Sequence, residues 1–262
     1  MAQFDDETSI SSVGDGVWET RLVANWNIGA YSNGGYAMSA VLRAMRELAG
    51  QPDPISVTTH FLRPVQGASV GRIEATLIRS GRTTATAYGT LSVDGKARLV
   101  VVAAFGDVEA EVGTGPEIGP IPPELPAVEN CIARVNLGQG VQLPLLSRID
   151  CVLDPGCVGR GERAVVQGWV RFSDGTAPST LSLPCFVDVF PPSLTGLVGD
   201  TGWVPTIELT THVRRVPKPG WLRARFECDD LHGGRMIETG ALWDSSGAIV
   251  ARSRQIGLLL RK

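Results

Sequence analysis

Apolar residues recur at helical spacing in the stretch NGGYAMSAVLRAMRELAG, residues 33–50. Asn33 is a residue type that caps helix N-termini, and Gly50 suits the position just beyond a C-terminus. Pro52 cannot continue a helix. The pattern therefore predicts one helix in this stretch. The side chains that share its apolar face are Met38, Val41, Leu42, Met45 and Leu48.

The segments on both sides of this helix have the composition of β-strands. Residues 16–29 read as a strand that ends in a turn. Four further strands follow the helix, and the last two form a hairpin through the Asp-Gly turn of VDGK. These strands are predicted at 55–64, 69–80, 82–93 and 97–106.

The second part of the chain has the same layout of a strand, an apolar segment and a meander. The apolar segment at 177–194 contains Pro184, Pro191 and Pro192, so its helix must be short or kinked. The predicted strands lie at 162–173 and near 204–216, 221–230, 234–244 and 248–260.

Residue identities support a tandem duplication. The tripeptide TTH at 58–60 occurs again at 210–212, and Arg63 matches Arg215. Beyond one inserted residue the identities stay collinear, which is the sign of an internal repeat. The further matches pair Gly67, Arg72, Glu74, Gly81, Arg82 and Thr86 with Gly220, Arg225, Glu227, Gly234, Arg235 and Thr239.

A Pro-rich, acidic stretch without periodicity separates the two copies and begins DVEAEVGTGPEIGPIPPELPAVEN. It predicts a linker at 107–140 between an N-terminal unit, 1–106, and a C-terminal unit, 141–262. Each unit can bury its apolar surface if its sheet curls around its helix, and two such units can pair their sheet edges. The predicted fold class is α+β. We expect a double hotdog, with two tandem repeats that each wrap a long antiparallel sheet around a central helix.

Composition narrows the functional classes. The formal net charge is −3, and there is no polybasic run, so nucleic acid is not an expected partner. No apolar run approaches the roughly 20 residues that span a bilayer. The N-terminus MAQFDDETSISSVGDG lacks the regions of a signal peptide. Five cysteines without a CxxC pair are typical of reduced thiols rather than of a metal site. We therefore expect a cytoplasmic protein without a metal or cofactor.

Several segments resemble the acyl-CoA thioesterase II (TesB-like) family, whose members are double hotdogs. The first half carries SNGGYAMSAVLRA followed by TTHFLRPV. The second half carries CFVDVFPP, PTIELTTHVRR and GAIVARSRQIGLLLR, in the family's order. The resemblance spans nearly the whole chain, and it implies hydrolysis of an acyl-CoA thioester to a free acid and CoA.

The resemblance places the family's catalytic aspartate, threonine and glutamine at Asp188, Thr206 and Gln255. A thioester hydrolase without a Ser-His-Asp triad needs an activated water, which a carboxylate can deprotonate while a hydroxyl and an amide hold it. An acid within the apolar CFVDVFPP is costly to bury, so it requires a partner or a chemical role. The repeat equivalents of Thr206 and Gln255 are Pro54 and Ala103, so one site per chain is expected.

Gly34, Gly35 and Tyr36 open the first helix and are predicted to contact the substrate. Free amides and the helix dipole at this point favour an anion. Close packing of the backbone is the alternative reason for two glycines. Tyr36 stands where better-known members of the family have glutamine, which bears on the acyl chain that the protein prefers.

Two other functions remain open. A non-catalytic acyl-CoA-binding module is one, because the second helix is interrupted and the strand after Thr206 departs from the family pattern. A hotdog hydratase or dehydratase is the other, but it needs a histidine paired with an acid. His60 and His212 lie on strands within a repeated tripeptide, which favours a structural role. Because related folds often associate through sheet edges or faces, association of chains into a homo-oligomer is also predicted.

Overall fold

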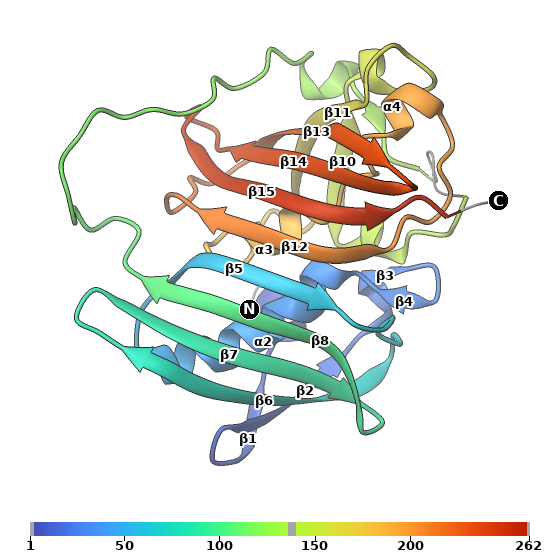
Figure 1. The fold of residues 1–262 in the computed structure, drawn as a ribbon. Coiled ribbons are helices and arrows are strands. Elements are labelled where there is room, and N and C mark those ends of the chain that lie inside the picture. The colour runs from blue at the N-terminus through green and yellow to red at the C-terminus, as the bar shows by residue number, and fades with distance from the viewer. Residues whose placement is uncertain (1–2, 136–139, 261–262) are drawn as a thin grey trace.

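The computed structural model describes residues 3–135 and 140–260 (Figure 1). The first half contains α1 (Gln3–Glu7), β1 (Ser11–Gly14), β2 (Val17–Leu22), β3 (Asn27–Ile28), β4 (Tyr31–Ser32), α2 (Gly34–Ala49), β5 (Asp53–Phe61), β6 (Ser69–Ser80), β7 (Thr84–Val93) and β8 (Lys96–Gly106). The second half contains β9 (Ile132–Ala133), β10 (Ile149–Leu153), β11 (Val165–Phe172), α3 (Leu183–Phe186), α4 (Thr195–Val198), β12 (Thr206–Val213), β13 (Leu222–His232), β14 (Arg235–Trp243) and β15 (Ile249–Leu258). Short 3-10 turns lie at Ala24–Trp26, Val128–Asn130, Pro144–Ser147 and Pro155–Cys157.

One antiparallel sheet of 13 strands runs through both halves, in the order β1-β2-β6-β7-β8-β5-β12-β15-β14-β13-β11-β10-β9. The order β2-β6-β7-β8-β5 of the first half matches β11-β13-β14-β15-β12 of the second. The two halves meet at β5 and β12, in the middle of the sheet (Figure 1). The meander that the sequence predicts in each half is therefore confirmed, and the central pair joins the two edges that would otherwise be exposed.

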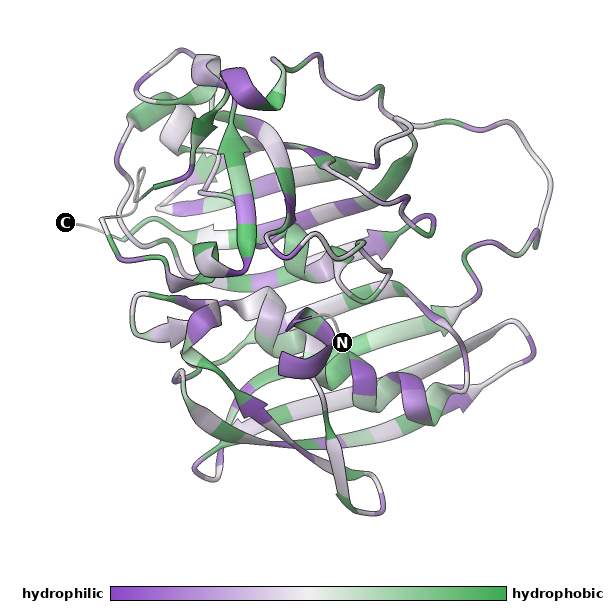
Figure 2. Ribbon diagram, turned by 180° about the vertical axis from the view of Figure 1, so that it is seen from behind, coloured by the Kyte–Doolittle hydropathy of each residue, from purple (hydrophilic) through white to green (hydrophobic). Residues whose placement is uncertain are grey.

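Helix α2 begins and ends where the sequence predicts. The Asn33 side chain caps it by accepting a hydrogen bond from the Tyr36 N–H at 2.8 Å. Gly50 ends it in the left-handed conformation, with φ of 61°. The helix packs against β6 and β7 on the inner face of the sheet, which Figure 2 shows from behind.

The apolar segment of the second half forms only the single turn α3, followed after two prolines by α4. Pro184 lies in the first turn of α3, and Pro191 and Pro192 cannot extend it. The expectation of a short or kinked helix is thus confirmed. The central helix of the second half is thus reduced to one turn within a buried, irregular chain.

The strand that ends in a turn, predicted within 16–29, is confirmed, because β2 ends at Leu22 and a 3-10 turn at Ala24–Trp26 follows it. Strand β10 was not anticipated, although its buried side chains alternate along Ile149, Cys151 and Leu153 in the manner of a half-buried strand.

Equivalent local features recur in the two halves. Arg72 and Glu74 form an ion pair of 3.0 Å on β6, and Arg225 and Glu227 form one of 2.9 Å on β13. The β7–β8 and β14–β15 hairpins both turn through a glycine with positive φ. These coincidences fall at the positions that the sequence repeat relates.

The chain between the halves is exposed along residues 109–121 and then lies on the second half. The Trp243 indole donates to the Pro120 carbonyl at 3.0 Å, and the Trp169 indole donates to the Pro126 carbonyl at 2.9 Å. Residues 136–139 of the predicted linker lie outside the described residues. Within the described part of the chain, none of the helices is long and apolar enough to cross a membrane.

Candidate active site

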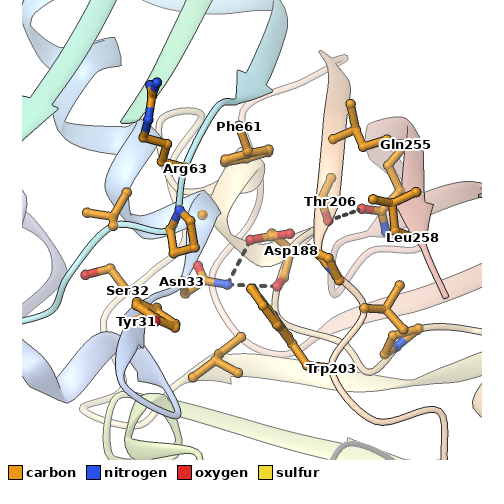
Figure 3. A pocket seen from close by; sticks show the side chains of 18 of the residues that line it. Tyr31, Ser32, Asn33, Phe61, Arg63, Asp188, Trp203, Thr206, Gln255 and Leu258 are labelled. Carbon is orange, nitrogen blue, oxygen red and sulfur yellow. Dashed lines mark hydrogen bonds between the residues drawn. The ribbon is translucent and has the colours of Figure 1, made fainter. Parts of the chain in front are cut away.

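A cavity of about 290 Å³ lies between the two halves, and both halves line it (Figure 3). Its wall combines apolar and polar side chains, with the charged Arg63 and Asp188 among them. Among the residues that line it are Tyr31, Asn33, Gly34 and Phe61 of the first half and Asp188, Trp203, Thr206, Gln255 and Leu258 of the second half.

Asp188 directly follows α3 and points into this cavity (Figure 3). Its Oδ2 accepts two hydrogen bonds of 2.8 Å, from the Asn33 side-chain amide and from the Gly35 N–H. The Asn33 amide also donates to the Asp188 carbonyl at 2.9 Å. No described residue donates to Oδ1, so that oxygen remains available to a ligand or water.

The two glycines that open α2 allow α3 to approach closely. A Cβ on Gly35 would lie 2.7 Å from Cys185 Cα and 3.0 Å from Asp188 Cβ. A Cβ on Gly34 would lie 2.6 Å from the Phe61 ring. Close packing, the steric reason for this pair, is therefore present in the structure. It also brings the helix N-terminus into contact with the acid.

The surroundings of Asp188 favour its protonated form more than water does. Burial raises its pKa to about 6, although the Gly35 N–H, the charge of Arg134 and the Asn33 amide each lower it. The charge of Glu238 raises it further. A carboxyl group with a pKa near neutrality can accept a proton from water and return it within one reaction cycle.

Thr206 faces the cavity because of a β-bulge. The register of β12 against β15 shifts between Thr206 and Glu208, so Thr206 does not share the outward direction of Glu208 and Thr210. The Thr206 hydroxyl donates to Gln255 Oε1 at 3.0 Å. Gln255 pairs with Leu209, whose side chain is buried, and so faces the interior as well.

Two charged groups beside the site were not found from the sequence. Glu238 is 3% exposed and accepts hydrogen bonds from the Gln255 side-chain amide and from the Ser193 N–H. Arg134 is 1% exposed, and its charge acts on Asp188. A signal for Glu238 does exist in the sequence, because Met236, Glu238 and Gly240 alternate on the inward face of β14. For Arg134 we find no such pattern.

The aromatic residues of the cavity wall come from both halves. Tyr31 and Trp203 stack with ring centroids 6.0 Å apart, and both are partly exposed. Phe61 and Leu258 also line the cavity (Figure 3). This part of the wall suits an apolar chain.

The residues predicted from the sequence to touch a substrate have different positions. Gly34 lines the cavity. The N–H of Gly35 is engaged by Asp188. Tyr36 is fully buried outside the cavity lining, stacked on Trp26 with centroids 5.0 Å apart. Its hydroxyl donates to the Glu7 carbonyl at 2.7 Å, so the expected contact of Tyr36 with substrate is replaced by a packing role.

The three histidines are exposed, and none of them lines the cavity. His60 pairs with Glu208 and His212 with Ser56 across the central strands, on the outer face of the sheet. The arrangement that a dehydratase requires, a histidine beside an acid at the substrate, is therefore absent from this cavity.

Two family models match the chain. The acyl-CoA thioesterase N-terminal domain matches residues 22–107, and the acyl-CoA thioesterase C-terminal domain matches residues 123–259. An uncharacterised protein of Mycobacterium bovis is 28% identical over 273 residues, which covers 93% of this chain and 91% of that protein.

Solved structures agree with the family models. A protein assigned as a thioesterase II in Thermobifida fusca is 30% identical with a TM-score of 0.88, covering 100% of this chain and 98% of that one. A hot dog fold protein of unknown function from Alicyclobacillus acidocaldarius is 19% identical with a TM-score of 0.87, covering 100% and 99%. The second likeness shows the fold alone. Both halves of the chain and its fold thus lead to one assignment, and the protein belongs to the acyl-CoA thioesterase family.

Proposed function

We propose that the protein hydrolyses an acyl-CoA thioester to a free acid and CoA, with Asp188, Thr206 and Gln255 as its catalytic residues. The observation that carries this proposal is the convergence of these three side chains on one cavity, where the hydrogen bonds from Asn33 and Gly35 to Asp188 both go to Oδ2. The membership of the chain in the acyl-CoA thioesterase family supports the same reaction.

In the proposed step, a water held between Asp188 and Thr206 attacks the thioester carbonyl carbon. Asp188 accepts the proton of this water as the C–O bond forms, which yields a tetrahedral oxyanion. The intermediate collapses when the C–S bond breaks, and the proton passes from Asp188 to the departing sulfur. The products are a carboxylic acid and CoA thiol, and Asp188 returns to its ionised state.

The N-terminus of α2 is the proposed site of the thioester oxygen. Gly34 lines the cavity, and its N–H finds no acceptor among the described residues. An unpaired amide at the start of a 16-residue helix combines a donor with the positive end of the helix dipole. We assign Gly34 to the oxyanion and Gly35 to holding Asp188.

The remaining parts of the proposal concern architecture and location. We interpret the matched strand orders as a double hotdog, with units at 1–106 and 141–262 and a linker at 107–140. A cytoplasmic location is supported by the five cysteines, all of which are free thiols. Association into a homo-oligomer stays a prediction, which the mass measured by light scattering tests.

Steady-state hydrolysis across a panel of acyl-CoAs tests the function, with release of free thiol as the readout. We expect turnover that depends on chain length, because the cavity lies near the small end of the roughly 300–1,000 Å³ typical of ligand sites. Saturable acyl-CoA binding without thiol release from any member of the panel would contradict hydrolysis. That result would favour the alternative function of a non-catalytic acyl-CoA-binding module.

A further inference from the structure

Glu238 is a buried carboxylate that the proposed reaction does not use. It lies on the inward face of β14, as the cross-strand partner of Gln255 on β15. Its Oε2 accepts the Ser193 N–H at 2.6 Å, and its Oε1 accepts the Gln255 side-chain amide. Burial raises the pKa of Glu238, whereas these hydrogen bonds lower it. Both partners are donors, which is the pattern that an ionised carboxylate requires.

This carboxylate determines which way the Gln255 amide faces. A side-chain amide has a donor end and an acceptor end, and a carboxylate can only accept. The NH2 end of Gln255 must therefore face Glu238, which leaves Oε1 facing Thr206. The Thr206 hydroxyl therefore donates its only proton to Gln255 Oε1, at 3.0 Å.

The direction of the hydrogen bonds from Thr206 to Gln255 to Glu238 decides whether the Thr206 hydroxyl donates to a water in the cavity or accepts from it. With its proton committed to Gln255, the Thr206 oxygen can only accept a hydrogen bond from water. A water between Thr206 and Asp188 Oδ1 then donates both of its protons, one to each, and keeps both lone pairs on the side of the carbonyl carbon. If the hydrogen bonds ran the other way, the Thr206 hydroxyl would donate to the water, occupy one of its two lone pairs and make it a weaker and differently oriented nucleophile.

We propose that Glu238 is a positioning residue that fixes the hydrogen-bond direction Thr206 to Gln255 to Glu238, and so orients the attacking water. The proposal rests on the proposed hydrolase function of the cavity. Glu238 itself does not line the cavity and does not touch the substrate or the water.

The substitution Glu238→Gln tests direction without changing shape. The Ser193 N–H needs an acceptor, so the new side chain must turn its oxygen toward Ser193 and its NH2 toward Gln255. Gln255 then reverses to present its oxygen to that NH2 and its own NH2 to Thr206. The Thr206 proton is released toward the cavity, where it donates to one of the two lone pairs of the water and changes the orientation of that water.

The variant Glu238→Gln also removes a charge that acts on Asp188. The charged and titratable groups that influence or adjoin Asp188 are Glu238, Arg134 and Cys185, and the thiol of Cys185 stays protonated because burial raises its pKa. Glu238 raises the pKa of Asp188, whereas Arg134 lowers it. Removal of the Glu238 charge must therefore move the titration of Asp188 to lower pH.

We expect Glu238→Gln to lower kcat by roughly 10- to 100-fold, the range that misplacement of a reacting group produces, with KM within about twofold of wild type. The acidic limb of the pH–rate profile should move to lower pH. Glu208→Gln is the matched control, because Glu208 lies on the outer face of β12 and accepts from Thr210 at 2.5 Å. This control should keep wild-type kcat and an unshifted profile.

The double variant Glu238→Gln/Gln255→Glu exchanges the acid and the amide. The carboxylate at position 255 can accept from Thr206 and from the new amide at 238, so the Thr206 proton again points away from the cavity. We expect a partial recovery of kcat over Glu238→Gln, with the acidic limb moved to higher pH because the charge now lies nearer to Asp188. A purely structural role for Glu238 predicts no such recovery.

The titration of the Asp188 carboxyl carbon, followed by 13C NMR and assigned with Asp188→Asn, separates this inference from the proposed function. If wild type hydrolyses no acyl-CoA, the hydrolase proposal fails, yet a downward shift of this titration in Glu238→Gln still supports the coupling. Wild-type kcat in Glu238→Gln, or no recovery in the double variant, overturns the positioning role. An unshifted Asp188 titration in Glu238→Gln overturns the coupling.

Discussion

Thr58 and Thr210 lie directly opposite each other on the two central strands, with their hydroxyl oxygens 2.9 Å apart. They are 152 residues apart in the sequence, and they are also the equivalent residues of the two repeats. Pairing of a residue with its own repeat equivalent is what the proposed double hotdog predicts at the junction of its two units, as at the centre of a twofold dimer interface.

The hydroxyl pair should contribute measurably to stability. Thr58→Val and Thr210→Val should each destabilise the protein, and the double variant should lose less than the sum of the two. A coupling of about 0.5–1.5 kcal/mol is expected for one intramolecular hydrogen bond. Urea unfolding of the four proteins measures it, with Thr76→Val, an exposed strand position, as the control. If the double variant loses as much stability as the two single variants together, the hydrogen bond between Thr58 and Thr210 does not contribute to stability.

Gly35→Ala should damage both packing and the position of the acid. The new methyl group would meet the Cys185 backbone at 2.7 Å, so α3 or α2 must shift. Overpacking of this kind typically costs about 1–3 kcal/mol, and hydrolysis should fall because Asp188 loses its Gly35 partner. Thermal unfolding and thiol release measure the two effects. Gly14→Ala is the control, since its nearest neighbour would be 3.9 Å away. If Gly35→Ala and Gly14→Ala had the same thermal stability and the same rate of thiol release, the close packing of α2 against α3 at Gly35 would not matter for either property.

The pH dependence of hydrolysis should follow the ionisation of Asp188. Activity requires the ionised carboxylate, whose pKa burial raises to about 6. We therefore expect kcat/KM to be constant above neutrality and to fall about tenfold for each pH unit well below 6. Initial rates across pH 4.5–8.5 test this expectation. A profile that stays flat down to pH 4.5 would remove Asp188 as the base.

The same shift makes a prediction about stability. The folded pKa of Asp188 lies above its unfolded value of roughly 3.9, so ionisation costs folding free energy. This cost is absent below about pH 4, grows as pH rises and is complete above pH 6. Asp188→Asn should therefore be more stable than wild type at pH 8, by at most about 3 kcal/mol. Below about pH 4, where the cost is absent, the two proteins should have the same free energy of unfolding. Urea unfolding at both pH values measures the difference, and Asp94→Asn, in an exposed turn, is the control.

The first helix and the meander strands were predictable because their signals are local. Asn33 and Gly50 define the ends of α2 through their own side-chain and backbone chemistry. The predicted strand 69–80 coincides with β6 for the same kind of reason. The helix of the second half was predictable only as an interruption, since Pro191 and Pro192 exclude its continuation without specifying the path of the buried chain.

The site was predictable only in part, because strand alternation fails at its centre. Regular alternation from Thr210 through Glu208 would place Thr206 on the outer face of the sheet. The bulge at Ile207 reverses it, and nothing in the local sequence indicates that bulge. For Tyr36, the sequence predicts contact with the substrate, whereas the structure buries the side chain away from the cavity. Its position in the helix suggested the cavity, but contacts with Trp26 and Glu7 hold it in the core.

The most direct measurement of the central claim is single-turnover hydrolysis of an acyl-CoA by Asp188→Asn. The asparagine can keep the contacts from Asn33 and Gly35 to the Oδ2 position, so the cavity should keep its shape while losing its base. We predict a loss of roughly 10²–10⁴-fold in rate, with substrate affinity and near-UV circular dichroism unchanged. A rate within a few-fold of wild type, in a variant that folds normally, would contradict the assignment of Asp188 as the general base.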